Sequence, residues 1–152
     1  EDLVVASENN LGRDVIQVSL ISDAFGYDVE STSGQSRFCI EVKTTLETRQ
    51  ETFFITKNET NKAAELQGQW RLVQIVLAPV AITQEQVTGA HVRRARTIDA
   101  STLLSLVPVD NDTGIWIDSA VIRPPSSAWT KENLQLPDNW YFGGYRFYSS
   151  VK

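Results

Sequence analysis

Three polar residues in the first third of the chain could form a site that cuts phosphodiester bonds. Glu41 and Lys43 are separated by one residue, and Asp28 precedes them. Hydrolysis of a phosphodiester needs an activated water, an offset for the negative charge on phosphorus and a stabilised leaving oxygen, and a divalent cation can supply all three. Mg²⁺ is typically held by one or two carboxylates. A lysine beside the attacking water adds a positive charge and can assist proton transfer.

Two neighbouring strands would have to position these residues. Residues 37–43 alternate between polar and apolar side chains, so Cys39, Glu41 and Lys43 should share the polar face of a strand, and we expect that face to meet polar groups. Residues 25–31 also alternate and place Asp28 on a polar face; a short polar turn joins the two strands. Paired strands lie about 4.8 Å apart, and facing carboxylates repel each other unless a cation binds between them. An ordinary exposed strand would explain the same pattern without a metal.

The other elements expected in the first half form a helix-and-strand series. They are a helix over 3–10, strands over 15–20, 53–56 and 70–78, and a helix from 57 to about 67. Thr56 and Glu59 fit a capping box at the start of the second helix. We therefore expect a core over 1–80 and an extension over 81–152 that packs on the same domain. In the extension we expect short helices over 82–87 and 100–106, a strand over 115–122 and a strand pair over 140–148.

Composition restricts the class of protein. The chain has 152 residues, of which 41% are hydrophobic and 22% charged, as in a soluble globular domain. No apolar run is long enough to span a membrane, and no signal peptide is visible. The only cysteine, Cys39, has no partner for an intrachain disulfide. These features favour a cytoplasmic protein that does not contact membranes.

The net charge of −5 argues against tight non-specific DNA binding by this chain alone. The chain also lacks an initiator methionine, so we expect it to come from a longer or processed polypeptide. Other domains or subunits, such as an ATPase or helicase, would then deliver the DNA. A compact basic run contains Arg93, Arg94 and Arg96, which could hold phosphates; a solvated strand face is an equally good explanation.

Three segments in order resemble a known family. They are Gly-Tyr-Asp-Val-Glu-Ser at 26–31, Phe-Cys-Ile-Glu-Val-Lys-Thr-Thr at 38–45, and Phe-Phe-Ile-Thr-Lys-Asn-Glu at 53–59. Together they are similar to the domain at the carboxy-terminus of the NO VEIN protein, which also occurs in bacterial restriction and helicase-associated proteins. That domain resembles the restriction-endonuclease-like PD-(D/E)XK nuclease superfamily. The resemblance covers roughly residues 8 to 78, and Tyr27 stands where the superfamily has its proline.

The resemblance implies an α/β fold with an αβββαβ core, a mixed central sheet and a C-terminal extension. It also implies a metal-dependent endonuclease that hydrolyses DNA in a restriction or anti-phage defence system. Asp28 and Glu41 would bind Mg²⁺, or Mn²⁺ in its place, together with the main-chain carbonyl of Val42. Lys43 would position or activate the attacking water. Glu8 on the first helix would be a possible additional ligand, although a solvated glutamate at a helix end explains it better.

Several alternatives stay open from the sequence. Asn58 belongs to the third motif and could contact nucleic acid, but the start of a capped helix also accounts for its position. Cutting both strands usually needs two active sites, so a homodimer is possible. The main competing function is a catalytically inactive nuclease-fold module that binds nucleic acid or protein. A β-rich carbohydrate-binding or surface-active domain, suggested by the aromatic residues at 140–148, would have no metal site.

Overall fold

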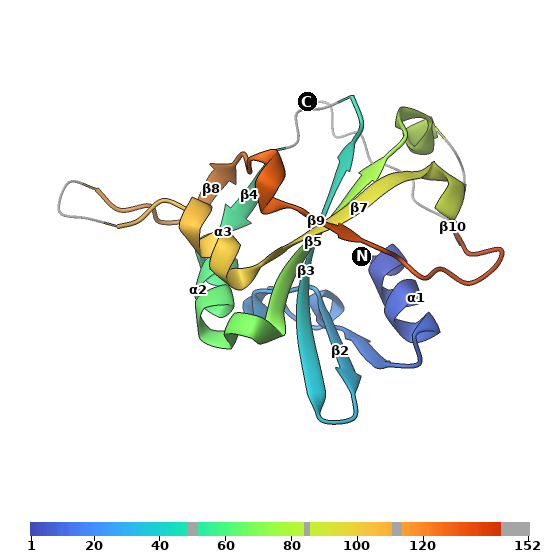
Figure 1. The fold of residues 1–152 in the computed structure, drawn as a ribbon, viewed down its shortest axis with the longest axis horizontal. Helices are drawn as coiled ribbons and strands as arrows, with labels where there is room; N and C mark the ends of the chain where they lie inside the picture. Colours follow the sequence, from blue (N-terminus) through green and yellow to red (C-terminus); the bar gives the residue numbers. More distant parts are fainter. Residues whose placement is uncertain (49–51, 84–85, 111–113, 144–152) are drawn as a thin grey trace.

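The central feature of the protein is a mixed β-sheet with helices on both faces (Figure 1). The computed structural model describes residues 1–48, 52–83, 86–110 and 114–143. Within these residues the helices are α1 (Asp2–Asn10), α2 (Lys57–Leu66) and α3 (Ala100–Leu106). Strands β1 (Asp14–Gln17), β2 (Val29–Ser33), β3 (Ser36–Leu46), β5 (Trp70–Leu77), β7 (Val92–Asp99) and β9 (Thr130–Glu132) form the main sheet, in the order β1-β2-β3-β5-β7-β9.

Two short antiparallel pairs complete the described strands. β4 (Phe53–Thr56) pairs with β8 (Ser119–Ile122), and β6 (Gln86–Thr88) pairs with β10 (Tyr141–Gly143). In the main sheet only β3 and β5 are parallel, and α2 lies in the connection between them. The order α1, β1, β2, β3, α2, β5, with β4 inserted before α2, confirms the predicted αβββαβ core and mixed sheet.

Alternation along β3 explains why the sheet is covered on both faces. Ile40 and Val42 belong to the apolar cluster beneath α1, whereas Cys39 is fully buried in the cluster beneath α2 and α3. The expectation that the second face meets only polar groups was therefore incomplete. On that face Glu41 follows the buried Cys39, and Lys43 lies one step further along the strand. The polar site thus begins where an apolar core ends.

Two expected strands are shorter than predicted. The strand over 15–20 ends at Gln17, and Val18–Leu20 form a 3-10 turn whose first amide donates to the Asp28 carbonyl. The strand over 25–31 begins only at Val29, and Asp23–Phe25 form another 3-10 turn. Both 3-10 turns lie beside Asp28, so these two segments form part of the site rather than of the regular sheet.

The second half agrees with prediction only in part. Helix α3 lies where it was expected. The expected helix over 82–87 is wrong at its ends, because Pro79–Thr83 form a 3-10 turn and Val87 lies in β6, and residues 84–85 lie outside the described residues. The strand over 115–122 begins at Ser119. Of the pair over 140–148, β10 pairs with β6, and residues 144–148 lie outside the described residues. Residues beyond 80 supply β7 and β9 to the main sheet. None of the helices in the described ranges is long and apolar enough to cross a membrane.

Candidate active site

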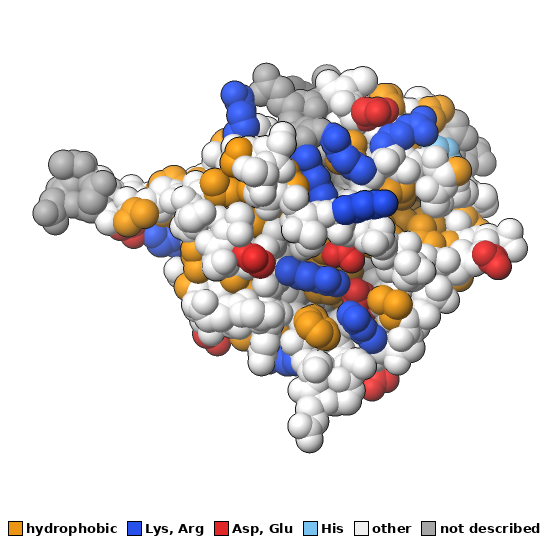
Figure 2. Space-filling model, in the orientation of Figure 1, with side chains coloured by type: hydrophobic (Ala, Val, Ile, Leu, Met, Phe, Trp, Pro, Cys, Tyr) orange, Lys and Arg blue, Asp and Glu red, His pale blue; other side chains and the backbone are white. Residues whose placement is uncertain are grey.

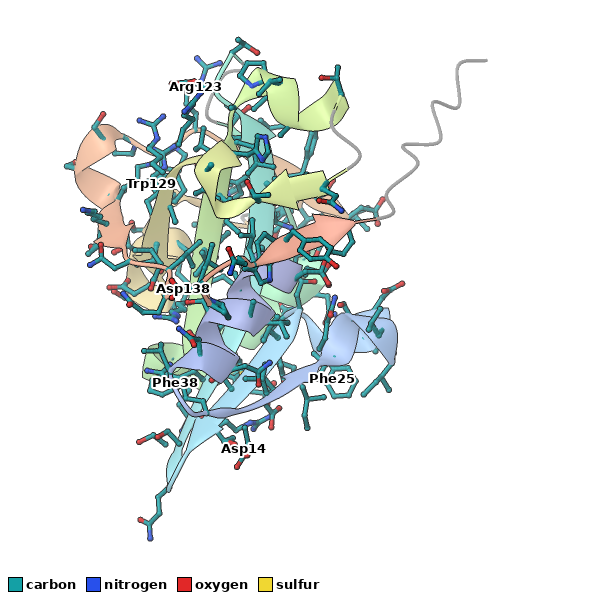
Figure 3. The ribbon with its side chains drawn as sticks, turned by 90° about the vertical axis from the view of Figure 1, so that its right-hand side faces the viewer. Asp14, Phe25, Phe38, Arg123, Trp129 and Asp138 are labelled. Atoms are coloured by element: carbon teal, nitrogen blue, oxygen red, sulfur yellow. The ribbon has the colours of Figure 1, made fainter. Side chains whose placement is uncertain are left out.

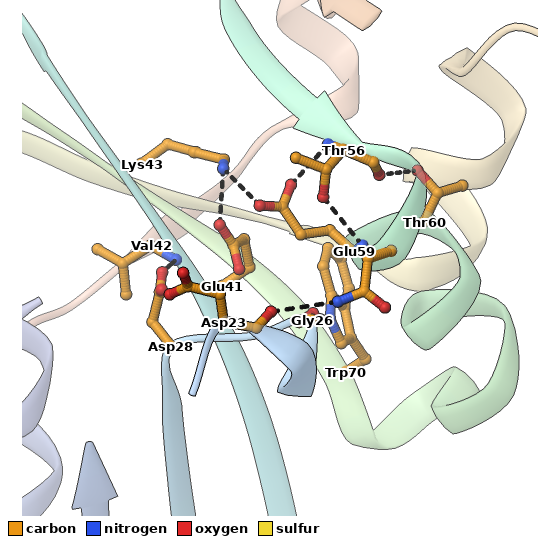
Figure 4. A network of polar contacts seen from close by, with 11 residues as sticks. Asp23, Gly26, Asp28, Glu41, Val42, Lys43, Thr56, Glu59, Thr60 and Trp70 are labelled. Carbon is orange, nitrogen blue, oxygen red and sulfur yellow. Dashed lines mark hydrogen bonds and ion pairs between the residues drawn. The ribbon is translucent and has the colours of Figure 1, made fainter. Parts of the chain in front are cut away.

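The structure brings Asp28, Glu41 and Lys43 together where β2 begins beside β3 (Figure 4). The Asp28 carboxylate accepts a hydrogen bond of 2.8 Å from the Val42 amide, and the Asp28 amide donates to the Ile40 carbonyl at 3.0 Å. Asp28 therefore continues the pairing of β2 with β3 through its side chain. Lys43 Nζ lies 2.6 Å from Glu41 Oε1. The three groups form one cluster, as the sequence predicted.

A tight turn before β2 delivers Asp28 to this position. Gly26 has a φ of 71°, a left-handed conformation that favours glycine, and a Cβ there would lie only 3.0 Å from the Asn58 carbonyl oxygen. The Asn58 amide group donates to the carbonyls of Asp23 and Ala24, both at 3.3 Å. Trp70 Nε1 lies 3.4 Å from the Gly26 carbonyl oxygen. The first turn of α2 and the start of β5 thus hold the segment that carries Asp28.

Glu59 is a member of the cluster that sequence reasoning assigned only to helix capping. Its Oε2 accepts the Thr56 amide at 2.8 Å while Thr56 Oγ1 accepts the Glu59 amide, so the predicted capping box is present. Its Oε1 lies 3.2 Å from Lys43 Nζ. The same carboxylate therefore caps α2 and holds the lysine. The sequence signal for this second role was weak, because a capping box alone accounts for both Thr56 and Glu59.

The electrostatics of the cluster favour an added cation. The side chains of Glu41 and Lys43 are 4% and 21% exposed. Burial, reinforced by the nearby Asp28 and Glu59 and opposed by Lys43, raises the pKa of Glu41 to about 8. Burial also raises the pKa of Asp28, although the bond from the Val42 amide opposes it. Burial would lower the pKa of Lys43, but Glu41 and Glu59 outweigh it and raise that pKa. When all three carboxyl groups are ionised, their negative charge exceeds the positive charge of the one ammonium, so a bound cation would be favourable.

The donors of the cluster suit a hard divalent cation. Asp28 and Glu41 offer carboxylate oxygens, which Mg²⁺ and Mn²⁺ prefer. Within the described ranges, no group of three or more His, Cys, Asp and Glu side chains could hold a metal, so a main-chain oxygen would be needed as well. The amide and carbonyl of one strand residue point to the same side of the strand. Because the Val42 amide faces Asp28, its carbonyl should face the same edge.

The raised pKa of Glu41 predicts a pH-dependent stability of the metal-free protein. A carboxyl group with a higher pKa in the folded than in the unfolded state stabilises folding while it stays protonated. For Glu41 this contribution should be complete below the ordinary value of 4.5 and lost as the pH rises through about 8. In EDTA, the melting temperature of the wild type should fall by up to roughly 3 °C per pH unit in this window. Glu41→Gln should flatten the decrease, and an equal decrease in both proteins would contradict the assignment.

Glu8 does not join the cluster. Its side chain is 4% exposed, so the expectation of a solvated helix-end glutamate was wrong. The carboxylate accepts hydrogen bonds from Arg13, Ser31 and Arg71, at 2.5, 2.6 and 2.9 Å. Two guanidinium groups therefore neutralise Glu8 in this structure, and it ties α1 to β2 and β5. As a metal ligand it would have to exchange these partners.

The basic run lies on β7 and is not uniformly solvated. Arg93 and Arg94 are exposed, and Arg93 Nε lies 3.5 Å from Glu47 Oε2. Arg96 is buried, and its Nε and Nη2 donate to Gln74 Oε1 at 3.0 and 2.7 Å. Sequence reasoning missed Gln74, although a glutamine within the otherwise apolar core of β5 was a signal.

Comparison with known proteins identifies the family. Residues 1–88 match the model of a family described as Protein NO VEIN, C-terminal. The chain belongs to this family. The match extends from α1 to β6, so the NO VEIN C-terminal family region contains Asp28, Glu41, Lys43 and Glu59 and ends before β7. This confirms the resemblance that the three sequence segments indicated.

A search of solved structures found a similar chain, the Holliday junction resolvase of the archaeal hyperthermophile Archaeoglobus fulgidus, solved at 1.6 Å resolution. It is 16% identical to this NO VEIN C-terminal family member, with a TM-score of 0.44. The similarity covers 84% of this chain and 88% of the resolvase chain. No curated protein matches the sequence.

Proposed function

We propose that this chain is a metal-dependent nuclease domain that hydrolyses DNA phosphodiester bonds, as an endonuclease of a restriction or anti-phage defence system. The observation that carries the proposal is the hydrogen bond from the Val42 amide to Asp28, which sets a second carboxylate beside the Glu41–Lys43 pair. Two carboxylates and a lysine in one partly buried cluster have the composition that metal-assisted phosphodiester hydrolysis requires. Family membership is consistent with this assignment.

Asp28, Glu41 and the Val42 carbonyl would hold Mg²⁺, with Mn²⁺ as a substitute. The ion would supply charge stabilisation and a more acidic bound water. Glu41 must be deprotonated to act as a ligand, and its raised pKa makes this easier at alkaline pH. Lys43 would then exchange its contact with Glu41 for the attacking water or a phosphate oxygen. Glu59, 3.2 Å from Lys43 Nζ, would keep the ammonium charged and in place during this exchange.

Additional domains or subunits, such as an ATPase or helicase, would bring the DNA to this chain. The acidic net charge of −5 supports this part of the proposal. A homodimer would supply the second active site that double-strand cutting needs. Nanomolar binding of duplex DNA by this chain alone at physiological salt would contradict the need for a delivery partner.

The proposed activity is tested by incubating supercoiled plasmid DNA and a structured RNA with the chain and Mg²⁺. Nicked or linear plasmid should form with Mg²⁺ or Mn²⁺ and disappear with EDTA, and RNA should stay intact. Cleavage that persists in EDTA would contradict metal dependence. Binding of DNA without cleavage under any metal condition would instead favour the inactive nuclease-fold module.

A further inference from the structure

A row of side chains crosses the main sheet from the candidate active site to the β9 edge. The strand register pairs Lys43 with Gln74, Gln74 with Arg96, and Arg96 with Lys131. Residues directly opposite each other on paired strands point to the same face of a sheet. These four side chains therefore share the face of Glu41, and three strand spacings separate Lys43 from Lys131 by about 14 Å.

In the middle of this row, Gln74 and Trp129 hold the buried guanidinium group of Arg96 in place. Arg96 forms two hydrogen bonds to Gln74 Oε1 and lies over the Trp129 ring, with its guanidinium carbon 3.9 Å from the ring centre. Gln74 is fully buried, and its Nε2 has no hydrogen-bond partner within the described residues. An unsatisfied buried donor is unfavourable and calls for an explanation beyond packing. The arrangement fixes a positive charge at this point of the sheet.

Lys131, at the far end of the row, lines a hollow of about 430 Å³ at the sheet edge, and the lining also includes Glu132 and three residues that pack on the α1 side of the sheet, Val92, Leu134 and Leu136. β9 pairs only with Ala95–Thr97, so the edge of β7 beyond Ala95 has no β9 partner. Arg94 and Lys131 both line the hollow at this edge, and both are exposed. The positive charge of Arg94 also contributes, after burial, to a lowered pKa of Arg96. An anion bound here would relieve the repulsion between the two arginines.

The surface view agrees with this accumulation of charge. Figure 2 shows Lys and Arg side chains gathered over β7 and β9. In Figure 3, Trp129 lies toward the same end of the molecule as Arg123, whereas Asp14 and Phe38 lie toward the opposite end. The Trp129 ring is the one that contacts the Arg96 guanidinium group. The positive surface is thus local, although the net charge of the chain is −5. Local positive charge is what a phosphate backbone recognises.

We propose that Arg94 and Lys131, with Arg96 held beneath them, form a phosphate-binding track for the DNA strand that enters the candidate active site. The direction of the DNA strand, from this track toward Lys43, rests on the proposed nuclease function. The separation of Lys43 from Lys131, about 14 Å, corresponds to roughly four nucleotides of one strand, at about 3.4 Å each. Arg93 is the residue of β7 that the register skips at the β-bulge, and it is paired with Glu47, so it is left out of the track.

The test measures binding of a fluorescein-labelled 20-base-pair duplex at several salt concentrations, with Ca²⁺ in place of Mg²⁺. Each lost phosphate contact should reduce the slope of log K against log salt by about 0.9. Arg94→Ala should show this reduction, and Lys131→Glu, which reverses the charge, should show at least as large a reduction, whatever the DNA sequence. Arg37→Ala is the matched control, because Arg37 is an exposed arginine at the opposite, hairpin end of β3. Circular dichroism melts check that each variant is folded.

Three outcomes would overturn the track: slopes for Arg94→Ala and Lys131→Glu equal to the wild type, an equal reduction in Arg37→Ala, or no binding of the duplex by the wild type at low salt. Because no cleavage is measured, the slopes test the track even if the proposed hydrolysis fails. Conversely, plasmid cleavage could be lost in Lys43→Ala while the slopes of Arg94→Ala and Lys131→Glu equal that of the wild type. That result would support the nuclease function and contradict the track.

Discussion

Replacing Lys43 with alanine is expected to slow Mg²⁺-dependent DNA cleavage by a factor of about 10²–10⁴, the usual contribution of a positioned acid–base group. Lys43 is the ammonium group of the cluster, 2.6 Å from Glu41 and 3.2 Å from Glu59. Its removal takes away the positive charge beside the proposed metal site but leaves both proposed metal ligands. Initial rates of plasmid nicking measure the effect, and Mn²⁺ titration should show that the ion still binds.

The matched control is Lys57→Ala. Lys57 begins α2, next to the cluster, and forms a similar ion pair of 2.6 Å with Asp110. Its loss removes the same charge from the chain without touching the site, so the cleavage rate should stay within about a factor of two, because an exposed ion pair contributes little. Cleavage that survives in Lys43→Ala at the wild-type rate would remove the mechanism.

Asp28→Asn is expected to reduce Mn²⁺ affinity and cleavage by at least about 100-fold, because loss of even an outer partner of a metal site costs about 10–100-fold. Asparagine keeps an oxygen that can accept the Val42 amide, so the bond that joins the turn to β3 can persist. The substitution therefore removes a charge with little change in structure. Isothermal titration with Mn²⁺ and plasmid nicking are the two measurements.

The control for Asp28→Asn is Asp23→Asn. Asp23 lies in the same connection between β1 and β2, and its backbone carbonyl, not its side chain, accepts the hydrogen bond from Asn58. Mn²⁺ affinity should therefore be unchanged. Equal Mn²⁺ affinity in Asp28→Asn and the wild type would show that the ion binds elsewhere or not at all.

Local patterns were enough to predict the parts of the site on regular elements. Alternation along β3 placed Glu41 and Lys43 on one face, and the spacing of Thr56 and Glu59 predicted the cap of α2. The positions of these residues follow from strand and helix geometry, which acts over a few residues. The family resemblance strengthened the interpretation of Asp28, Glu41 and Lys43 as a metal site, which spacing alone supported only weakly.

The remaining features depend on contacts between distant parts of the chain. The turn before Asp28 is fixed by Asn58, and the burial of Glu8 depends on Arg71 of β5. A three-residue strand such as β9 gives almost no periodic signal, so the place of Lys131 beside Arg96 could not be foreseen. Cys39 was assigned to a polar face because its strand alternates, but α2 and α3 cover that face with a second core.

The central claim, that Asp28 and Glu41 share one divalent cation, is tested most directly by soaking crystals of the chain in Mn²⁺ and recording anomalous diffraction. One strong anomalous peak should lie between these carboxylates, within about 2.0–2.3 Å of an oxygen of each and close to the Val42 carbonyl. The peak should be absent from crystals of Asp28→Asn. A peak at another place, or none at saturating Mn²⁺, would contradict the account.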